Sequence, residues 1–358
     1  MTRFSIVGAG WRTEFFLRIA QALPDLFEIP RILVRNPVRA EEIERTWKVK
    51  TCDSLDTLLA DKPDFVITSV SWDANPIFLC ELAERKMPVL SETPPARSVE
   101  DLLALVDLIK AGANIQIAEQ YAFRPEHEAR INLARSGRLG EVFQAQLSVA
   151  HGYHGISLIR KLLDINYEEA TISARRLTEK VAGGPDRNGR PPTEETMQES
   201  TQLVAHLDFD GKQGVFDFVG SQYRSWVRSP RFLVRGTRGE INGTEVRYLK
   251  DFQTPIVTGL TRVDTGHGGN LDGYYHRGIT IGDEWFFKNP FPFARLNDDE
   301  IAIAICFQKM MERIEGGPDF YPLEEGCQDH YLSILMERSA DTGQPVRSEV
   351  MPWVSKSA

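Results

Sequence analysis

Short apolar segments alternate with helical patterns through the first third of the chain. Each apolar segment is only a few residues long and ends in a polar or glycine-containing turn. This alternation is typical of a doubly wound parallel α/β sheet, in which ligands bind where the strands end. The pattern predicts strands at residues 4–7, 31–34, 64–70, 88–91 and 114–118, with helices at 76–85 and 99–110.

The pattern changes after residue 121. Strands joined by short turns, as at 210–213 and 236–239, indicate a largely antiparallel open sheet. We therefore predict a dinucleotide-binding Rossmann domain at 1–121 and a substrate-binding and oligomerisation α+β domain at 122–358. The second domain has predicted helices at 125–136, 153–163, 298–315 and 323–342, predicted strands at 142–150, 170–178, 201–209, 214–220, 231–236 and 245–249, and long loops at 182–200 and 264–278.

Composition and charge exclude several classes of protein. The 358 residues carry a formal net charge of -9 without a block of Lys or Arg, so we expect no nucleic-acid surface. No signal peptide or apolar run of membrane-spanning length stands out, so we expect no membrane contact. The cysteines are scattered at 52, 80, 306 and 327, which predicts reduced thiols in the cytoplasm and no metal site.

A glycine turn follows the first predicted strand. Gly8 allows a tight turn, and Gly10 lets the main chain approach a pyrophosphate without a Cβ in the way. Thr13 occupies the position of the usual third glycine. We predict that a dinucleotide binds here, at the start of the next helix, with contacts from Gly8, Ala9, Gly10, Trp11 and Arg12, and from Ser71 after a later strand.

The end of the second predicted strand indicates which dinucleotide binds. An acidic residue at this position would bind the ribose 2′-hydroxyl of NAD, whereas an arginine accommodates a 2′-phosphate. The sequence here is Leu-Val-Arg-Asn-Pro, with Arg35 in the turn and no carboxylate. We therefore favour NADP(H) over NAD(H), although an arginine at this site also occurs beside NAD.

Four segments in this order and spacing resemble the Gfo/Idh/MocA family, which includes glucose–fructose oxidoreductase and inositol dehydrogenase. The segments lie at 6–10, 89–94, 153–160 and 232–241. In the family the second segment contains Glu-Lys-Pro, whose glutamate lies near the cofactor and whose lysine orients the substrate or relays its proton. Glu92 and Pro94 match this motif, but Thr93 replaces the lysine and cannot supply an ammonium group.

The third segment resembles the family's Asp-x-x-x-His element. His154 stands at the position of the histidine that faces the nicotinamide, and Ala150 stands where the family has aspartate. An imidazole suits proton exchange because its pKa lies near neutrality. The resemblance therefore implies His154, Tyr153 and Glu92 as catalytic residues, with Glu92 also near the cofactor, and His151 close by.

The resemblance implies an NAD(P)-dependent oxidoreductase that acts on a carbohydrate, polyol or related small polar substrate. Predicted substrate contacts are Thr93, Tyr121, Arg124, His151 and His267. Two alternatives remain open: a non-catalytic NAD(P)-binding sensor, and an enzyme that uses transient oxidation for elimination or glycosidic cleavage. Because relatives cover the open face of the antiparallel sheet with another subunit, we expect a homodimer or homotetramer.

Overall fold

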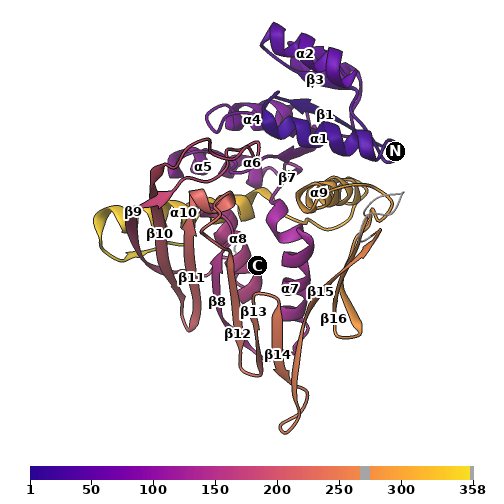
Figure 1. Ribbon diagram of the computed structural model, residues 1–358. Helices are drawn as coiled ribbons and strands as arrows, with labels where there is room; N and C mark the ends of the chain where they lie inside the picture. Colours follow the sequence, from indigo (N-terminus) through magenta and orange to yellow (C-terminus); the bar gives the residue numbers. More distant parts are fainter. Residues whose placement is uncertain (267–274, 355–358) are drawn as a thin grey trace.

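The computed structural model describes residues 1–266 and 275–354, and within them the chain forms two β-sheets (Figure 1). The first sheet is entirely parallel, with strand order β4-β3-β1-β5-β6-β7 and β2 beside the start of β1. Strands β5, β6 and β7 are buried at every position, which explains their largely apolar runs. The strands of this sheet are β1 (Thr2–Val7), β2 (Phe27–Glu28), β3 (Arg31–Leu33), β4 (Lys50–Cys52), β5 (Phe65–Thr68), β6 (Val89–Ser91) and β7 (Ile115–Ile117).

Helices connect the parallel strands, and three of them begin at polar side chains that the sequence supplies. Ser54 accepts the backbone N–H of Thr57 at the start of α3. Asn36 accepts two backbone N–H bonds at the start of α2, and Ser98 forms a reciprocal capping box with Asp101 at the start of α5. The predicted helix at 99–110 is two helices, because the backbone N–H of Leu105 bonds three residues back, as in a tighter turn. The helices are α1 (Trp11–Ala22), α2 (Pro37–Trp47), α3 (Leu55–Ala60), α4 (Asn75–Glu84), α5 (Val99–Ala104) and α6 (Val106–Lys110).

The second sheet has eleven strands in the described residues, in the order β17-β16-β15-β14-β13-β12-β8-β11-β10-β9-β18. Neighbouring strands are antiparallel except β8 and β11, which are parallel. The predicted fold class, a parallel Rossmann sheet followed by a largely antiparallel sheet, is therefore confirmed. The strands are β8 (Val142–Ser148), β9 (Thr171–Ala182), β10 (Met197–Phe209), β11 (Lys212–Val219), β12 (Arg231–Gly236), β13 (Gly239–Asn242), β14 (Glu245–Leu249), β15 (Pro255–Thr265), β16 (Tyr275–Ile281), β17 (Glu284–Lys288) and β18 (Val346–Arg347).

The two long loops predicted in this half are shorter than expected. Strands β9 and β10 pair as far as Ala182 and Met197, so only residues 183–196 connect them. Strands β15 and β16 likewise extend into the predicted loop at 264–278, where Thr265 pairs with Tyr275. The ends of these strands consist mostly of polar and half-exposed residues, so they lack the alternation of apolar and polar positions by which strands were predicted.

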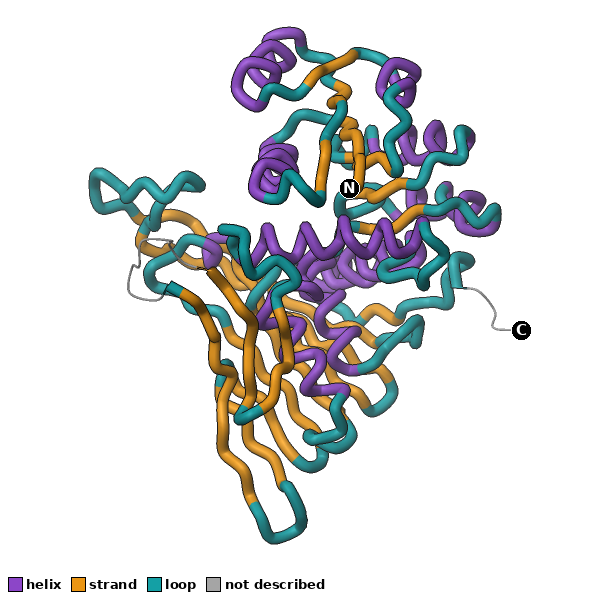
Figure 2. The backbone as a smooth tube through the Cα atoms, turned by 90° about the vertical axis from the view of Figure 1, so that its right-hand side faces the viewer, coloured by secondary structure: helices purple, strands orange, loops and turns teal. Residues whose placement is uncertain are grey.

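Helices fill the space between the two sheets (Figure 2). Helices α7 (Pro125–Arg135), α8 (Gly152–Leu163) and α10 (Leu323–Thr342) pack against strands of the large sheet. Helix α9 (Asp298–Ile314) instead joins the apolar core of the parallel sheet, where Phe307 contacts Phe4 with ring centroids 4.6 Å apart. Two 3₁₀ turns, η1 (Gln120–Phe123) and η2 (Gly220–Tyr223), lie near the start of α8. None of the helices in the described part of the chain is long and apolar enough to cross a membrane.

Candidate active site

The turn after β1 has the geometry that a dinucleotide pyrophosphate requires. Gly8 has φ of +114°, and a Cβ there would lie 2.0 Å from the Ser69 carbonyl oxygen, so only glycine fits. A Cβ on Gly10 would meet nothing within 4 Å, which leaves its backbone open to a ligand at the start of α1. Thr13 is buried and its hydroxyl donates to the Gly8 carbonyl at 3.2 Å, so this side chain supports the turn in place of a third glycine.

Two arginines that follow β3 line a cavity that also contains the glycine turn. Arg39 donates to the Ala9 carbonyl at 3.2 Å and pairs with Glu14 and Glu42, each at 2.7 Å. Arg35 is exposed and has no ion pair with any residue in 1–266 or 275–354. Arg35 therefore retains its full set of guanidinium donors for a ligand.

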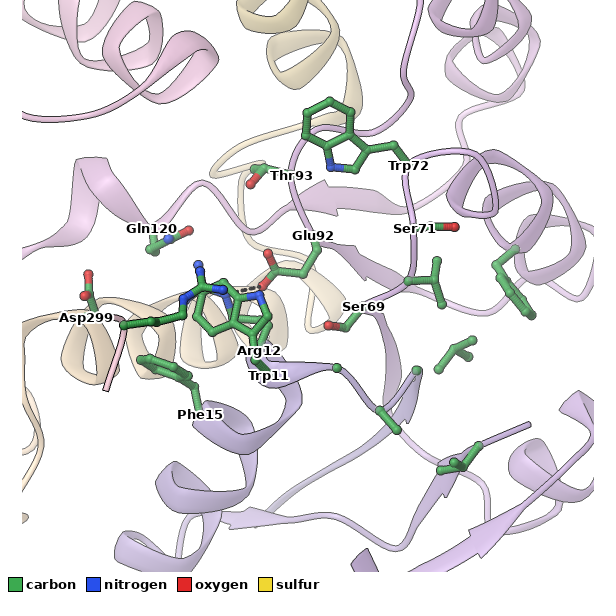
Figure 3. Close-up of a pocket in the computed structure, with 18 of the residues that line it drawn as sticks. Trp11, Arg12, Phe15, Ser69, Ser71, Trp72, Glu92, Thr93, Gln120 and Asp299 are labelled. Carbon is green, nitrogen blue, oxygen red and sulfur yellow. Dashed lines mark ion pairs between the residues drawn. The ribbon is translucent and has the colours of Figure 1, made fainter. Parts of the chain in front are cut away.

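A single cavity of about 1010 Å³ joins the glycine turn to the start of α8. Figure 3 shows part of its lining, including Trp11, Arg12 and Glu92. The cavity opens along the carboxyl edge of the parallel sheet, which is where α/β folds bind their ligands. All eight predicted cofactor contacts line it, namely Gly8, Ala9, Gly10, Trp11, Arg12, Arg35, Ser71 and Glu92. Thr93, Tyr121, His151, Tyr153 and His154 line it as well.

Arg12 places a permanent positive charge in the middle of this cavity. Figure 3 shows its guanidinium directed toward Glu92 and Gln120; the Nε to Oε1 distance to Glu92 is 3.5 Å. With its amide nitrogen on the Ala118 carbonyl, Gln120 accepts a hydrogen bond from Arg12 at 3.1 Å. Burial raises the pKa of Glu92, and the neighbouring Arg12 opposes that shift. Arg12 thus supplies a positive charge next to Glu92, in a cavity whose Thr93 side chain carries none.

His154 is held by a carboxylate that the sequence analysis missed. Its Nδ1 lies 2.6 Å from Oε2 of Glu119, and both side chains are almost completely buried. The other carboxylate oxygen of Glu119 accepts the backbone N–H of Tyr121 at 3.2 Å. Glu119 comes two residues after β7, and a carboxylate just past a parallel strand was the signal available in the sequence.

Burial determines the protonation of the Glu119–His154 pair. It raises the pKa of Glu119 to about 8 and lowers that of His154 well below its usual value. Below pH 8 the pair holds two protons, one between Nδ1 and the carboxylate and one on Nε2, so Nε2 donates. Loss of one proton near pH 8 leaves Nδ1–H bonded to the carboxylate and turns Nε2 into a proton acceptor.

A chain of hydrogen bonds runs beside this pair. The hydroxyl groups of Tyr121 and Tyr223 are 3.0 Å apart, and Tyr223 is 2.8 Å from Nδ1 of His151. The Tyr121 ring packs on His154 at 4.3 Å between centroids. Burial raises the pKa of both tyrosines and lowers the pKa of His151 to about 3, although His151 remains exposed on the cavity wall. The chain therefore links neutral groups from the interior to solvent.

Tyr153 and Trp72 form an aromatic wall on the opposite side of His154. The Tyr153 ring lies 4.5 Å from His154 and 6.3 Å from Trp72, between centroids. The Tyr153 hydroxyl donates to the Thr93 carbonyl at 3.5 Å, and burial raises its pKa above the usual range. Aromatic faces combined with a few polar groups are typical of small-molecule sites.

One predicted substrate contact, Arg124, is not brought into this cavity. Arg124 points to Asp299, with 3.4 Å between Nε and Oδ1, and is not part of the lining. His267 lies outside the described residues. Besides Glu119, the sequence analysis also missed Gln120, Tyr223, Arg187, Arg224 and Asp299, all of which line the cavity. Tyr223 and the two arginines belong to the large sheet and its connections, where no local pattern indicates proximity to the glycine turn.

No group of three or more His, Cys, Asp or Glu side chains among residues 1–266 and 275–354 is arranged to hold a metal ion.

Comparison with known proteins agrees with this arrangement. Residues 2–119 match the family described as "Oxidoreductase family, NAD-binding Rossmann fold", GFO_IDH_MocA. A search of curated proteins finds no match. Among solved structures, an oxidoreductase from Agrobacterium radiobacter in complex with NAD⁺, L-tartaric acid and magnesium shares 19% identity over 96% of this chain and 98% of that chain, with a TM-score of 0.65.

Two further solved structures share the fold over the whole chain. A putative myo-inositol dehydrogenase from Sinorhizobium meliloti 1021 is 17% identical, with 98% and 100% coverage and a TM-score of 0.64. A levoglucosan dehydrogenase in complex with NADH and levoglucosan is 16% identical, with 97% and 99% coverage and a TM-score of 0.68. Residues 2–119 thus match a family of oxidoreductases with an NAD-binding Rossmann fold, which confirms the predicted resemblance and the predicted class of enzyme.

Proposed function

We propose that the protein is an NAD(P)-dependent dehydrogenase of a sugar, polyol or related small polar substrate. One observation carries this proposal: a single cavity joins the Gly8–Gly10 turn to the buried Glu119–His154 pair. The levoglucosan dehydrogenase of the same fold, in complex with NADH and levoglucosan, supports the carbohydrate class.

The residues around the turn suit a nicotinamide dinucleotide. The backbone of Gly8 and Gly10 and the start of α1 would hold its pyrophosphate, and Arg35 would hold a 2′-phosphate. For this reason we favour NADP(H) over NAD(H). A nicotinamide held there would supply hydride transfer to or from the carbon that bears the substrate oxygen.

The protein side of the reaction is proton transfer and charge stabilisation. In oxidation, Nε2 of His154 takes the hydroxyl proton as the C–H bond gives up its electron pair, and Glu119 stabilises the resulting imidazolium. Arg12 supplies a fixed positive charge near the reacting oxygen, which Thr93 cannot do. Tyr153 lines the wall beside His154, where its hydroxyl is available to orient the substrate.

The Glu119–His154 pair favours an enzyme over a non-catalytic sensor. A sensor has no need of a buried carboxylate on its histidine, and such a pair is costly to bury without a role. Ala150 removes the family's aspartate, but Glu119 gives His154 a carboxylate from another element. An enzyme that oxidises its substrate transiently, to allow elimination or glycosidic cleavage, would use the same groups. The product analysis described next distinguishes it from a dehydrogenase.

Binding and turnover test this proposal directly. Fluorescence titrations with NADPH and NADH are expected to show tighter binding of NADPH, and Arg35→Gln is expected to remove that difference. A panel of sugars and polyols is then followed at the nicotinamide absorbance, with product analysis to detect elimination without net redox change. Binding without turnover of any panel member would support a sensor, whereas absence of binding would contradict the proposal.

We also propose a cytoplasmic homo-oligomer, a dimer or tetramer formed through the large sheet. Large apolar side chains on its strands support an interface, because Leu177, Val257 and Trp285 are 55%, 62% and 43% exposed. Four free cysteines support a reducing compartment. Light scattering at several concentrations gives the oligomeric state.

A further inference from the structure

The cavity has the opposite charge from the protein as a whole. The chain carries a formal net charge of -9, yet in the described residues the cavity is lined by five arginines and two carboxylates. The arginines are Arg12, Arg35, Arg39, Arg187 and Arg224, and the carboxylates are Glu92 and Asp299. A recess with an excess of cations concentrates anionic ligands from solution.

Protein carboxylates neutralise only some of these charges. Arg12 faces Glu92, and Arg39 pairs with two glutamates outside the cavity. Asp299 is already paired with Arg124. Among the five arginines that line the cavity, three have no ion pair with any described residue: Arg35, which follows β3, and Arg187 and Arg224.

Arg187 and Arg224 reach the cavity from the half of the chain that forms the large sheet. Arg187 belongs to the connection between β9 and β10, and its guanidinium lies 4.3 Å from the centroid of the Trp11 ring. Arg224 directly follows Tyr223, which is bonded to Tyr121 and His151.

The two segments that carry these arginines touch each other. A Cβ added to Gly184 would lie 3.0 Å from the Arg224 carbonyl oxygen and 3.3 Å from Cα of Ser225. The two cations therefore come from adjoining segments, with Arg187 over Trp11 near the start of α1 and Arg224 next to the tyrosine–histidine chain.

We propose that Arg187 and Arg224 bind the anionic group of the substrate, which is a sugar derivative carrying a carboxylate or a phosphate. Guanidinium groups bind both anions through paired charge-assisted hydrogen bonds. The cofactor pyrophosphate already has the glycine turn and the N–H groups of α1, so these two cations are left for a second anion. The inference rests on the proposed function and specifies its substrate class.

Matched pairs of ligands separate an anionic substrate from a neutral one. Gluconate is compared with glucitol, and glucose 6-phosphate with glucose, each added to the protein saturated with NADH while the fluorescence of the bound cofactor is followed. The anionic member is expected to bind at least about tenfold tighter than its neutral partner at low ionic strength. This preference should shrink as salt is added. The pair that shows the preference identifies carboxylate or phosphate as the group recognised.

Variants assign the preference to these two residues. Arg187→Gln, Arg224→Gln and the double variant are compared with Arg190→Gln and Arg228→Gln. The control arginines are exposed, lie in the same two segments and do not line the cavity. The double variant is expected to lose about tenfold or more in affinity for the anionic ligand with little change for its neutral partner. The controls should match the wild type, and the NADH dissociation constant should change less than about twofold in all variants.

The outcomes of the two proposals differ. A wild-type protein that fails to bind NADH or NADPH contradicts the proposed function itself. A protein that binds the cofactor but shows no preference for the anionic ligands overturns this inference alone. A double variant that keeps the preference, or that loses NADH affinity instead, also overturns it, since the arginines would then serve another ligand.

Discussion

At the scale of single residues, Glu119 changes what His154 can do. An isolated histidine would titrate near neutrality, as the sequence analysis expected, but this ring is buried and bonded to a carboxylate at 2.6 Å. Its acid–base behaviour therefore belongs to the pair. The protonation of His154 is therefore coupled to a residue that comes 35 positions earlier in the chain.

Glu119→Gln is expected to alter the pH dependence of turnover. In the wild type the pair loses a proton near pH 8, so kcat/KM for oxidation should rise through pH 8 and that for reduction should fall. Glutamine keeps the hydrogen bond to Nδ1 but cannot titrate, so the rise should disappear. Initial rates between pH 6 and pH 10 measure this, and oxidation at pH 9 should drop about 100-fold because the imidazolium loses its counter-ion.

His154→Ala provides the matched comparison, with a loss of about 100-fold or more at every pH. NADH binding is measured alongside and should be unchanged in both variants. A Glu119→Gln enzyme that keeps the wild-type pH profile would remove the carboxylate from the reaction.

The residue-level site was only partly predictable from the sequence. Gly8, Glu92 and His154 stand in local motifs, and all three line one cavity. Tyr223 and Arg224 have no such motif, because their position depends on how the large sheet packs against η1 and α8. Glu119 lies between these cases, since it follows a strand but matches no motif that was considered.

At the scale of elements, the buried strands were the most predictable. In β5 all four residues are buried, and the apolar run that predicted it extends only a few residues beyond its ends. Strands β13, β15, β16 and β17 were not predicted as strands. In β15 the exposed and half-buried positions contain Thr, Gly, Arg and Asp, so no regular alternation marks the strand. Pairing with neighbouring strands, which a local pattern does not report, holds it in place.

Helix α7 contains a carboxylate whose environment destabilises the folded protein at neutral pH. Oε2 of Glu128 is buried without a hydrogen-bond partner among the described residues, and burial raises the pKa of this group from 4.5 to about 7. The folded state therefore binds this proton more tightly than the unfolded state. Stability contributed by the protonated form is present below pH 4.5 and is lost as the pH rises through 7.

Glu128→Gln is expected to stabilise the protein at pH 8 by about 1–3 kcal/mol, with little effect at pH 4.5. The amide has the same shape and stays neutral, so it avoids the cost of burying a carboxylate. Urea denaturation at the two pH values gives the free energy of unfolding. Glu126→Gln in the same helix is the control, and since its partner Arg130 forms only a partly exposed pair, a change below about 1 kcal/mol is expected. Equal effects of Glu128→Gln at both pH values would contradict this explanation.

At the scale of the whole molecule, the two predicted domains share a core. Helix α9 comes after the large sheet in the chain, yet its apolar residues pack with Phe4, Phe16 and Phe27 from the parallel half. Arg18 of α1 also pairs with Glu300 of α9 at 2.7 Å. The domain boundary at residue 121 stays a prediction. Residues 1–121 alone would leave this aromatic cluster exposed to solvent, so we do not expect them to fold independently.

Phe307→Ala is expected to lower the stability of both halves together. Phe307 is fully buried, and its ring lies within 6 Å of Phe4, Phe16 and Phe27, so its removal should cost about 3–5 kcal/mol. Because α9 links the two halves, calorimetry should show a single unfolding transition at a lower temperature than in the wild type. Near-ultraviolet and far-ultraviolet circular dichroism should give the same midpoint. Phe293→Ala is the control, since that side chain is 68% exposed and should leave the transition in place. Two separate transitions in the Phe307 variant would mean that the parallel half unfolds by itself. The shared aromatic core would then not be what couples the unfolding of the two halves.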